Sequence, residues 1–365
     1  MARAVVIRGA GGMDVCDLAV AGPREGEVRV RMRAAGVCHS DLNVLNRSGT
    51  GMFLPAVLGH EGSGVVEDVG PGVGDLEPGD HVILAVVAQC GHCLYCTSGQ
   101  PTLCEQGHFG RGALLRDGTT RLTFDGQPVG QMAGLGTWCE EAVVAADVAI
   151  KVDPSMPFPQ AAILGCGVVT GYGAAVNAGH VGPGETVAVI GCGGVGLSGL
   201  QGARIAGAGR IIAIDVVEGK LDLATTMGAT ETLDATAVDD VVAEVLDRTG
   251  GHGADVVLDF VGSASTSAQA VAMTRNGGRC VFTGLAGSDW SISVTDFLRY
   301  GKTITGNYMG MGNFRKTFAE LTTLYHQGRL QLDEMVSREI AVTEVAEAFR
   351  AMQAGEVARS VITKW

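Results

Sequence analysis

Hydrophobic and polar residues alternate near the start of the chain. Val28, Val30 and Met32 are separated by single arginines, which gives a period of two with one apolar face. This pattern predicts a half-buried β-strand. Turn residues such as Gly22 with Pro23 interrupt the flanking sequence. We therefore expect the first part of the chain to be an irregular, mostly β unit.

From about Gly182 the pattern changes to apolar strand, glycine turn and helix. Strand-like apolar segments occupy residues 187–190, 211–214, 256–260 and 280–283. Their alternation with helical stretches predicts a parallel sheet with helices on both faces. After about Gly306, residues 314–325 and 342–352 have amphipathic helical spacing, and residues 360–364 are expected to form a last strand. This tail is expected to return to the first unit.

Composition supports a globular protein of two domains. The chain has 365 residues, of which 46% are hydrophobic and 18% charged, which does not fit a disordered chain. A net charge of -13 argues against nucleic acid and anionic lipid as partners. Glycine accounts for 56 residues, about twice its usual share of roughly 7%. Many tight turns or close backbone approaches are implied.

Two apolar stretches resemble membrane spans at first sight. Residues 161–181 and 186–203 contain no charged side chain, but glycines interrupt both and the second runs into Arg204. We predict buried segments and no membrane span. The start of the chain has no pattern of a signal peptide, so a cytoplasmic protein is expected. Its ten cysteines are then expected to bind metal or to stay reduced.

The most specific local motif is a run of four cysteines, Cys90, Cys93, Cys96 and Cys104. Four thiolates at this spacing can surround one zinc ion tetrahedrally. An iron–sulfur cluster is the alternative, but the bacterial ferredoxin run is shorter at its end and is followed by proline. Because four protein ligands leave no open position, a zinc ion here would be structural.

A glycine motif follows the strand at residues 187–190. Gly191, Gly193 and Gly196 fill the three positions of GxGxxG, and Asp215 ends the next strand 19 residues after Gly196. Such glycines let a pyrophosphate approach a helix N-terminus. The carboxylate can bind a ribose diol and would repel a 2′-phosphate, which favours NAD over NADP. A glycine turn without a nucleotide is the alternative for this motif alone.

A third set of residues is scattered along the chain: Cys38, His60 and Cys166. Taken singly, each fits a buried structural residue. His60, however, belongs to a pattern GHExxGxxxxxGxxV, filled by Gly59, His60, Glu61, Gly64, Gly70 and Val73. With the four-cysteine run and the glycine motif in this order, the chain resembles the zinc-dependent alcohol dehydrogenases of the medium-chain superfamily, in their liver-type dimeric branch, over residues 2–365.

The resemblance implies a fold class and domain boundaries. Residues 1–168 and 307–365 would form a GroES-like, mostly β catalytic domain with a structural zinc lobe at residues 88–106. Residues 169–306 would form a Rossmann domain with a doubly wound parallel sheet that binds NAD. The segment 105–138 resembles a long loop of dimeric relatives and implies a homodimer.

The resemblance also implies the roles of individual residues. Cys38, His60 and Cys166 would hold a catalytic zinc ion with its fourth position open to water or substrate, as in alcohol dehydrogenases. Asp41 would orient His60, Glu61 would lie beside the metal, and Ser40 would hydrogen-bond the alcohol. Cofactor contacts would come from His39, Thr170, Gly191, Gly193, Gly194, Val195, Gly196, Asp215, Lys220, Thr283, Leu285 and Arg359.

The implied reaction interconverts a primary alcohol and its aldehyde by hydride transfer to or from NAD. Asn43 stands where relatives carry the histidine that takes up the released proton, and an amide cannot act as that base. We expect the proton to leave through water or another group.

The implied substrate pocket is mostly apolar. Small side chains at Val86 and Ala133 suggest room for a medium-to-large aromatic, allylic or terpenoid alcohol. The six residues of this predicted lining are Val86, Phe109, Met132, Ala133, Leu285 and Tyr308.

Several related functions are alternatives. Glutathione-dependent formaldehyde dehydrogenases have acidic groups and an arginine where this chain has Ser48, Thr50 and His108, which disfavours that activity. Two alternatives are an enzyme that uses another thiol adduct and an aldehyde dismutase. Zinc-free quinone reductases fit the sequence poorly. A noncatalytic NAD-binding scaffold is disfavoured because a scaffold has no use for an open metal site.

Overall fold

The computed structural model describes residues 1–9, 12–46, 51–107, 112–285 and 289–365. The chain divides into two compact units. Unit 1 comprises Met1–Gly167, Asn313–Gln327 and Leu332–Trp365, and unit 2 comprises Val168–Gly312 and Gly328–Gln331. Each unit is described separately below.

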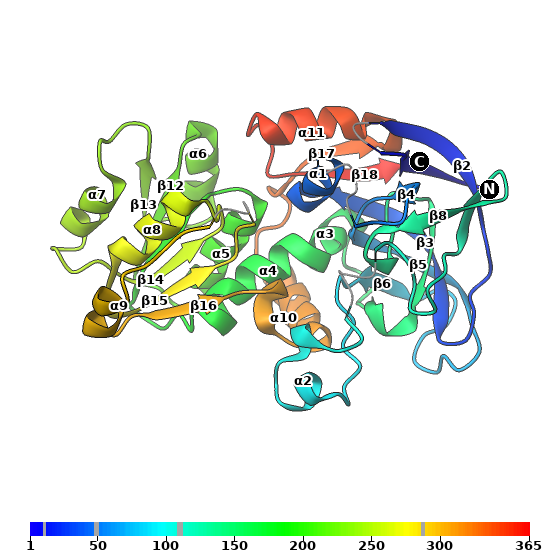
Figure 1. Ribbon diagram of the computed structural model, residues 1–365, viewed down its shortest axis with the longest axis horizontal. Helices are drawn as coiled ribbons and strands as arrows, with labels where there is room; N and C mark the ends of the chain where they lie inside the picture. Colours follow the sequence, from blue (N-terminus) through cyan, green and yellow to red (C-terminus); the bar gives the residue numbers. More distant parts are fainter. Residues whose placement is uncertain (10–11, 47–50, 108–111, 286–288) are drawn as a thin grey trace. The chain divides into compact units, whose positions relative to one another are not determined.

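Unit 1 is mostly β-structure (Figure 1). Its strands are β1 (Ala2–Ile7), β2 (Met13–Val20), β3 (Glu27–Val37), β4 (Ala56–Val57), β5 (Glu61–Val69), β6 (His81–Leu84), β7 (Leu122–Phe124), β8 (Gln127–Gln131), β9 (Glu141–Ala145), β10 (Ala149–Lys151), β17 (Val336–Ala341) and β18 (Arg359–Lys364). Its helices are α1 (His39–Asn46), α2 (Leu94–Thr97), α3 (Phe158–Ile163), α10 (Phe314–His326) and α11 (Val345–Gln353). Short 3₁₀ segments are η1 (Pro101–Leu103), η2 (Met132–Gly134), η3 (Ala146–Val148) and η7 (Val342–Glu344).

The strands of unit 1 form a closed barrel and a larger sheet. The barrel order is β1-β2-β7-β8-β4, and the sheet order is β10-β6-β5-β3-β18-β17, with β9 also paired to β3. The period-two prediction for β3 is confirmed, since Val28, Val30 and Met32 are buried while Arg33 is exposed. The C-terminal strand β18 pairs with β3, so the tail of the chain does return to this unit.

Unit 2 contains the parallel sheet. Its strands are β11 (Thr186–Ile190), β12 (Arg210–Asp215), β13 (Glu231–Asp234), β14 (Ala254–Asp259), β15 (Thr274–Phe282) and β16 (Thr303–Gly306). Its helices are α4 (Val169–Gly173), α5 (Gly194–Ile205), α6 (Glu218–Thr226), α7 (Val241–Arg248), α8 (Ala264–Met273) and α9 (Val294–Tyr300), with the π-helical segment η5 (Ala174–Ala178) and the 3₁₀ segment η6 (Met309–Met311). The strand order β13-β12-β11-β14-β15-β16 is parallel throughout.

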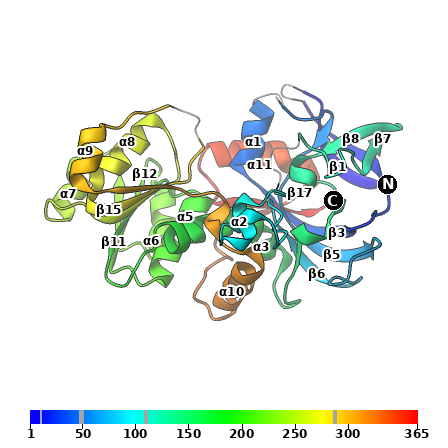
Figure 2. The same ribbon diagram turned by 60° about the horizontal axis from the view of Figure 1, so that its bottom comes forward.

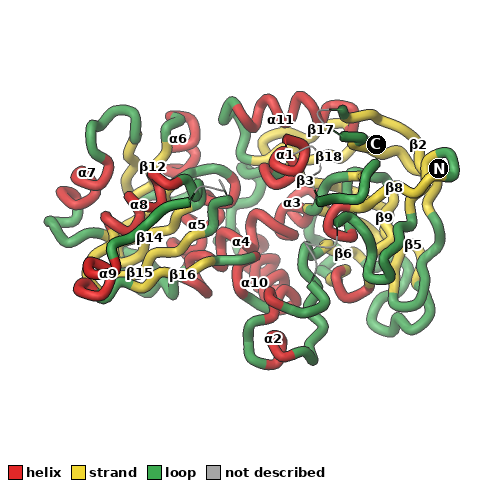
Figure 3. The backbone as a smooth tube through the Cα atoms, in the orientation of Figure 1, coloured by secondary structure: helices red, strands yellow, loops and turns green. Residues whose placement is uncertain are grey.

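Helices cover both faces of this sheet, as predicted. The crossover from β11 to β12 moves one way along the sheet and the crossover from β14 to β15 moves the other way. Right-handed crossovers then place α5 and α6 on one face and α8 on the other. Figure 2 shows the strands lying between these two groups of helices, and Figure 3 shows the parallel strands side by side in yellow.

One strand begins earlier than its apolar pattern indicated. The pattern predicts a strand from Cys280, but β15 begins at Thr274. Its first half is polar and contains Gly277 and Gly278, and the register shifts where it pairs with the start of β14. Thr274 pairs with Ala254, and regular pairing resumes at Arg279. The strand therefore continues through residues that carry no apolar signal.

The long apolar helical segment is a core element. Residues Phe158–Ala178 are long and apolar enough to cross a membrane by length and composition, but 83% of the apolar window is buried inside the protein. The segment includes π-helical turns at η4 (Leu164–Val168) and η5. Burial of this extent is typical of a helix that packs in a protein core.

The glycine turn after β11 gives a matched test of packing. A Cβ at Gly196 would lie 1.8 Å from the Gly191 oxygen, whereas a Cβ at Gly193 would meet nothing within 4 Å. Gly196→Ala is therefore expected to lower the free energy of unfolding by about 1–3 kcal/mol through overpacking. Gly193→Ala is expected to leave it unchanged. Urea unfolding of both variants without dinucleotide measures the difference, and equal midpoints would contradict this account.

Candidate functional site

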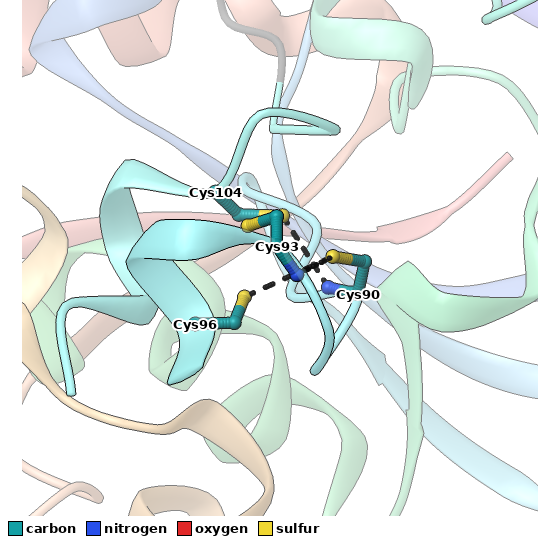
Figure 4. Close-up of side chains that lie close together, drawn as sticks. All are labelled: Cys90, Cys93, Cys96 and Cys104. Atoms are coloured by element: carbon teal, nitrogen blue, oxygen red, sulfur yellow. Dashed lines mark hydrogen bonds between the residues drawn. The ribbon is translucent and has the colours of Figure 1, made fainter. Parts of the chain in front are cut away.

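Four cysteine sulfurs gather in a lobe of unit 1. Figure 4 shows Cys90, Cys93, Cys96 and Cys104 with their side chains directed toward one another. The four sulfurs lie within 4.8 Å of one another. The Sγ atoms of Cys90 and Cys96 are 4.0 Å apart, and those of Cys93 and Cys104 are 3.9 Å apart. A zinc–sulfur distance of about 2.3 Å gives tetrahedral S–S edges of about 3.8 Å, so the cage fits one zinc ion.

Backbone amides also favour thiolates in this cage. The Cys90 amide donates to Cys104 Sγ at 3.3 Å, and the Cys93 amide donates to Cys90 Sγ at 3.4 Å. Hydrogen bonds from the backbone of Cys96 and Glu105 lower the pKa of Cys93 to about 6. Helix α2 contributes no buried residue. Metal binding by the four sulfurs can therefore organise the lobe, because apolar packing contributes little.

A second group of donors comes from distant segments of unit 1. Cys38 follows β3, His60 precedes β5, Glu61 begins β5, and Cys166 lies in η4. Their ligand atoms lie within 4.8 Å of one another. The structure therefore brings together the three scattered residues that the resemblance implies, with Glu61 beside them. Two sulfurs and one imidazole suit zinc and leave a fourth position for another ligand.

Asp41 connects the segments that carry these donors. Its Oδ1 accepts from the Gly59 amide at 3.0 Å and pairs with His60 Nδ1 at 3.0 Å, and its Oδ2 accepts from the Cys38 amide at 3.0 Å. Asp41 and His60 are both fully buried. Because Nδ1 faces the carboxylate, Nε2 is the nitrogen directed to a metal, the arrangement that fixes the tautomer in metal sites.

Positive φ at Gly59 makes this approach possible. Its φ is +87°, and a Cβ there would lie 2.4 Å from Trp138 Cδ1. Only glycine adopts this backbone without strain and without displacing the indole. The glycine of the GHE pattern thus sets the direction in which His60 enters the cluster.

The electrostatics of the cluster favour a thiolate at Cys38 and a thiol at Cys166. A hydrogen bond from the Cys166 thiol, opposed by burial and aided by His60, lowers the pKa of Cys38 well below its usual value. The same hydrogen bond and burial raise the pKa of Cys166. Burial alone would lower the pKa of His60, but the charge and hydrogen bond of Asp41 raise it well above its usual value. A buried cation would stabilise both thiolates and release the shared proton.

Glu61 and Arg359 form a second layer behind the cluster. Glu61 Oε1 accepts from the Gly167 amide at 3.0 Å, and Oε2 lies 3.5 Å from Arg359 Nε. Burial raises the pKa of Glu61 to about 7, although the Arg359 guanidinium opposes the rise. Gly36 makes room for this carboxylate, since a Cβ there would lie 2.1 Å from Glu61 Oε2. Arg359, which the resemblance implies as a cofactor contact, is buried against Glu61 in this structure.

Helix α1 carries the other predicted residues of unit 1. His39 is exposed at its start, while Ser40 and Asn43 are partly buried. Asp41 is the residue of this helix that the structure places against the donor group. Direct contact of Ser40 with an alcohol, and the proton route past Asn43, stay predictions.

The glycine motif forms a turn between β11 and α5 in unit 2. Gly191 has a φ of +87°, and Gly193 is the N-cap of the twelve-residue helix α5, with no side-chain hydrogen bond to the cap. Gly194, Val195 and Gly196 form its first turn. The amides of an uncapped helix N-terminus, with open space over Gly193, suit a phosphate group.

Asp215 is held beside this turn by backbone amides. Its Oδ2 accepts from the Cys192 amide at 2.7 Å, and its Oδ1 accepts from Val216 and Val217 at 2.8 and 3.0 Å. Lys220 Nζ lies 3.9 Å from Oδ1. The carboxylate and the glycine turn are thus neighbours at the carboxyl edge of the sheet, the edge where open α/β sheets bind ligands.

The residues of the predicted substrate pocket fall into different surroundings. Val86 and Ala133 line a cavity of about 370 Å³ in unit 1, together with Leu115 and Val148. Met132 is buried, whereas Leu285 and Tyr308 are exposed in unit 2. Phe109, together with Ser48, Thr50 and His108, lies outside the described residues.

Sequence reasoning missed several residues that shape these sites. Gly36 and Gly167 provide space around Glu61, and Asn307 hydrogen-bonds both Thr170 and Thr283. Asn307 directly follows β16, a strand that the apolar pattern does not predict, so the local sequence carries no signal for it. The two glycines carry no local signal, because the carboxylate that they accommodate comes from another segment.

Comparisons with known proteins agree with this geometry. Residues 24–154 match the family described as alcohol dehydrogenase GroES-like domain, and residues 194–327 match the family described as zinc-binding dehydrogenase. The NDMA-dependent alcohol dehydrogenase of Amycolatopsis methanolica is 37% identical over 366 aligned residues, covering 99% of this chain and 98% of that protein. The S-(hydroxymethyl)glutathione dehydrogenase of Escherichia coli is 37% identical over 353 residues, covering 96% of each.

A solved structure extends this agreement to the fold. The benzyl alcohol dehydrogenase of Acinetobacter calcoaceticus superposes with a TM-score of 0.93 at 33% identity, covering 100% of this chain and 99% of that one. The chain therefore belongs to the zinc-dependent alcohol dehydrogenases of the medium-chain superfamily and is an oxidoreductase. The predicted family and fold class are confirmed, and the liver-type dimeric branch stays a prediction.

Metal content tests both clusters. Purified protein is expected to contain two zinc ions per chain, and Cys96→Ser or Cys166→Ser is expected to reduce this to one, because each removes a ligand from a different cluster. Elemental analysis of the purified variants provides the count. Cys16→Ser, which lies outside both clusters, is the control and should retain two ions. A Cys166→Ser protein that retains two would contradict the assignment of its cluster.

Proposed function

We propose that this protein is an NAD-dependent enzyme that interconverts hydrophobic primary alcohols and aldehydes, with one catalytic and one structural zinc ion per chain. The proposal rests on one observation above all: the ligand atoms of Cys38, His60 and Cys166 converge within 4.8 Å, with Asp41 on the far nitrogen of His60. A zinc ion bound there supplies a Lewis acid that polarises an alcohol or carbonyl oxygen.

The residues of unit 1 hold and shield this centre. Asp41 holds His60 so that its Nε2 is directed to the metal site, and both Cys38 and His60 are buried. Ser40 would hydrogen-bond the substrate hydroxyl and receive its proton. Since Asn43 has no basic atom to accept that proton in turn, the route from Ser40 would continue through water or another group.

The residues of unit 2 support the choice of dinucleotide. The turn from Gly191 to Gly196 would bind the pyrophosphate at the start of α5. Asp215 would accept hydrogen bonds from the adenosine ribose, and Lys220 would contact the same sugar. Three backbone amides already donate hydrogen bonds to the Asp215 carboxylate and fix its position, and a carboxylate there would repel a 2′-phosphate. This favours NAD over NADP.

The broader assignments follow the resemblance. We propose that residues 1–168 and 307–365 form the catalytic domain and residues 169–306 the NAD-binding domain, in a cytoplasmic homodimer. Six of the ten cysteines lie in the two candidate metal clusters, and metal-bound thiolates support a reducing compartment. The resemblance of segment 105–138 to a loop of dimeric relatives supports the dimer.

The cavity beside Val86 and Ala133 supports a bulky substrate. Val86 and Ala133 belong to its lining, and its volume of about 370 Å³ lies within the range of ligand pockets. Arg121 lines the same cavity, but its guanidinium is already hydrogen-bonded to Glu27 and Asp117. The lining that the structure describes contains none of the three candidate ligands of the catalytic zinc ion, so a path from the cavity to the metal centre is part of the proposal. The apolar residues of the lining favour an aromatic, allylic or terpenoid group.

Turnover of a panel of alcohols tests the function. NADH formation is expected with benzyl, cinnamyl and terpenoid primary alcohols, measured by absorbance with NAD⁺ and NADP⁺ in parallel. His60→Ala is expected to reduce the rate by about a thousandfold, because Lewis-acid stabilisation is worth several kcal/mol. Formaldehyde with and without glutathione belongs in the panel, since one relative is an S-(hydroxymethyl)glutathione dehydrogenase. No turnover with any alcohol while zinc and NAD⁺ are bound would favour a noncatalytic protein.

Enlarging Ala133 tests the substrate pocket. Ala133 already carries a Cβ at a φ of 55°, so leucine adds volume without a new backbone requirement. Ala133→Leu is expected to lower kcat/KM for benzyl alcohol about tenfold or more by steric exclusion, with little change for ethanol. The exposed Ala237→Leu is the matched control. An equal loss for both alcohols would contradict a role in substrate size selection.

A further inference from the structure

A buried amide lies at the carboxyl edge of the parallel sheet in unit 2. Asn307 directly follows β16, whereas Asp215 ends β12 on the other half of the sheet. With the order β13-β12-β11-β14-β15-β16, a dinucleotide spans the switch point between β11 and β14, and each half of the sheet serves one nucleotide. If Asp215 binds the adenosine ribose, Asn307 lies on the half that receives the nicotinamide.

The Asn307 side chain joins three segments of unit 2. Its Nδ2 donates to the Thr170 backbone oxygen and to Thr283 Oγ1, both at 3.1 Å. Its backbone amide donates to the Phe282 oxygen at 2.8 Å. Because a backbone carbonyl can only accept, the nitrogen of the amide must face Thr170. The ends of β15 and β16 and helix α4 are therefore connected through one amide group.

A left-handed turn follows directly. Met309, Gly310 and Met311 have φ values of 52°, 74° and 55°, which non-glycine residues rarely adopt. Asn177 Nδ2 donates to the Gly310 oxygen at 2.7 Å, and a Cβ at Gly173 would lie 2.1 Å from that oxygen. A hydrogen bond from η5 and close packing against α4 thus hold the strained turn in place. Such strain persists where the surroundings impose it, often at ligand sites.

Stability alone does not explain an amide at this position. Asn307 is 8% exposed, and its Oδ1 has no hydrogen-bond partner among the residues that the structure describes. A buried oxygen without a partner opposes folding, and an apolar side chain would avoid that cost. The hydrogen bonds of the amide instead hold Thr170 and Thr283 in fixed positions.

We propose that Asn307 is a positioning residue for the nicotinamide half of the dinucleotide. By holding Thr170, Thr283 and the turn at Met309–Met311 in one arrangement, it preorganises the surface on which the nicotinamide ring packs. Preorganisation reduces the ordering cost of binding, and here it acts on one half of the ligand only. The inference rests on the proposed function, because it requires a nicotinamide dinucleotide at this edge.

Comparison of NAD⁺ with ADP-ribose tests the inference. ADP-ribose shares the adenosine and pyrophosphate of NAD⁺ and lacks the nicotinamide. In titration calorimetry of the full-length, zinc-loaded protein, Asn307→Ala is expected to raise the Kd of NAD⁺ about tenfold, the loss of about one net hydrogen bond. The Kd of ADP-ribose should stay within about twofold. Asn276→Ala, an exposed asparagine in β15, is the matched control and should change neither.

A second variant covers the case in which Asn307→Ala fails to fold. Asn177→Ala releases the same turn from η5 and should weaken NAD⁺ selectively in the same way. Equal weakening of both ligands, or weakening of neither, overturns the inference. Wild-type protein that binds neither ligand overturns the proposed function and the inference with it, whereas wild-type protein that binds both leaves the variants to decide the inference alone.

Discussion

The candidate metal centre depends on a single buried carboxylate. Asp41 accepts hydrogen bonds from the amides of Cys38 and Gly59 and pairs with the imidazole of His60. Charge-assisted hydrogen bonds contribute about 1.5–3 kcal/mol each, and a buried charge that loses its partner costs about 3–5 kcal/mol. The carboxylate is satisfied only when these segments are in place. This region therefore cannot fold with Asp41 satisfied unless His60 is also correctly placed.

The strongest sequence predictions were those whose information is local. The four-cysteine cage lies within 15 residues, Cys90 to Cys104, and the glycine turn with Asp215 spans one strand–helix–strand unit. In both cases spacing along the chain determines proximity in space. Cys38, His60 and Cys166 are different, because no spacing relates them. Their grouping came from the resemblance, and the structure now shows the donor atoms together.

What sequence could not predict depends on contacts between distant segments. Gly36 is required by a carboxylate from the next strand, Glu61, and Gly167 by the same carboxylate and by Arg359. Asn307 owes its importance to partners 137 and 24 residues away. The first half of β15 lacks apolar side chains, and its pairing with β14 starts at Thr274 and resumes at Arg279 after a register shift. In each case the role of the residue depends on a contact with a distant segment, which the local sequence pattern does not contain.

The order of the cysteine lobe depends on its four sulfur atoms, because the other side chains of the lobe provide little apolar packing. Helix α2 buries no residue, and Leu94 and Leu103 are exposed. Most positions of the lobe can therefore be substituted with little effect on its structure, whereas the four cysteines are required. Divergence in this stretch would be concentrated between the cysteines, and a homologue that has lost one of the four would need a different means of ordering the whole lobe.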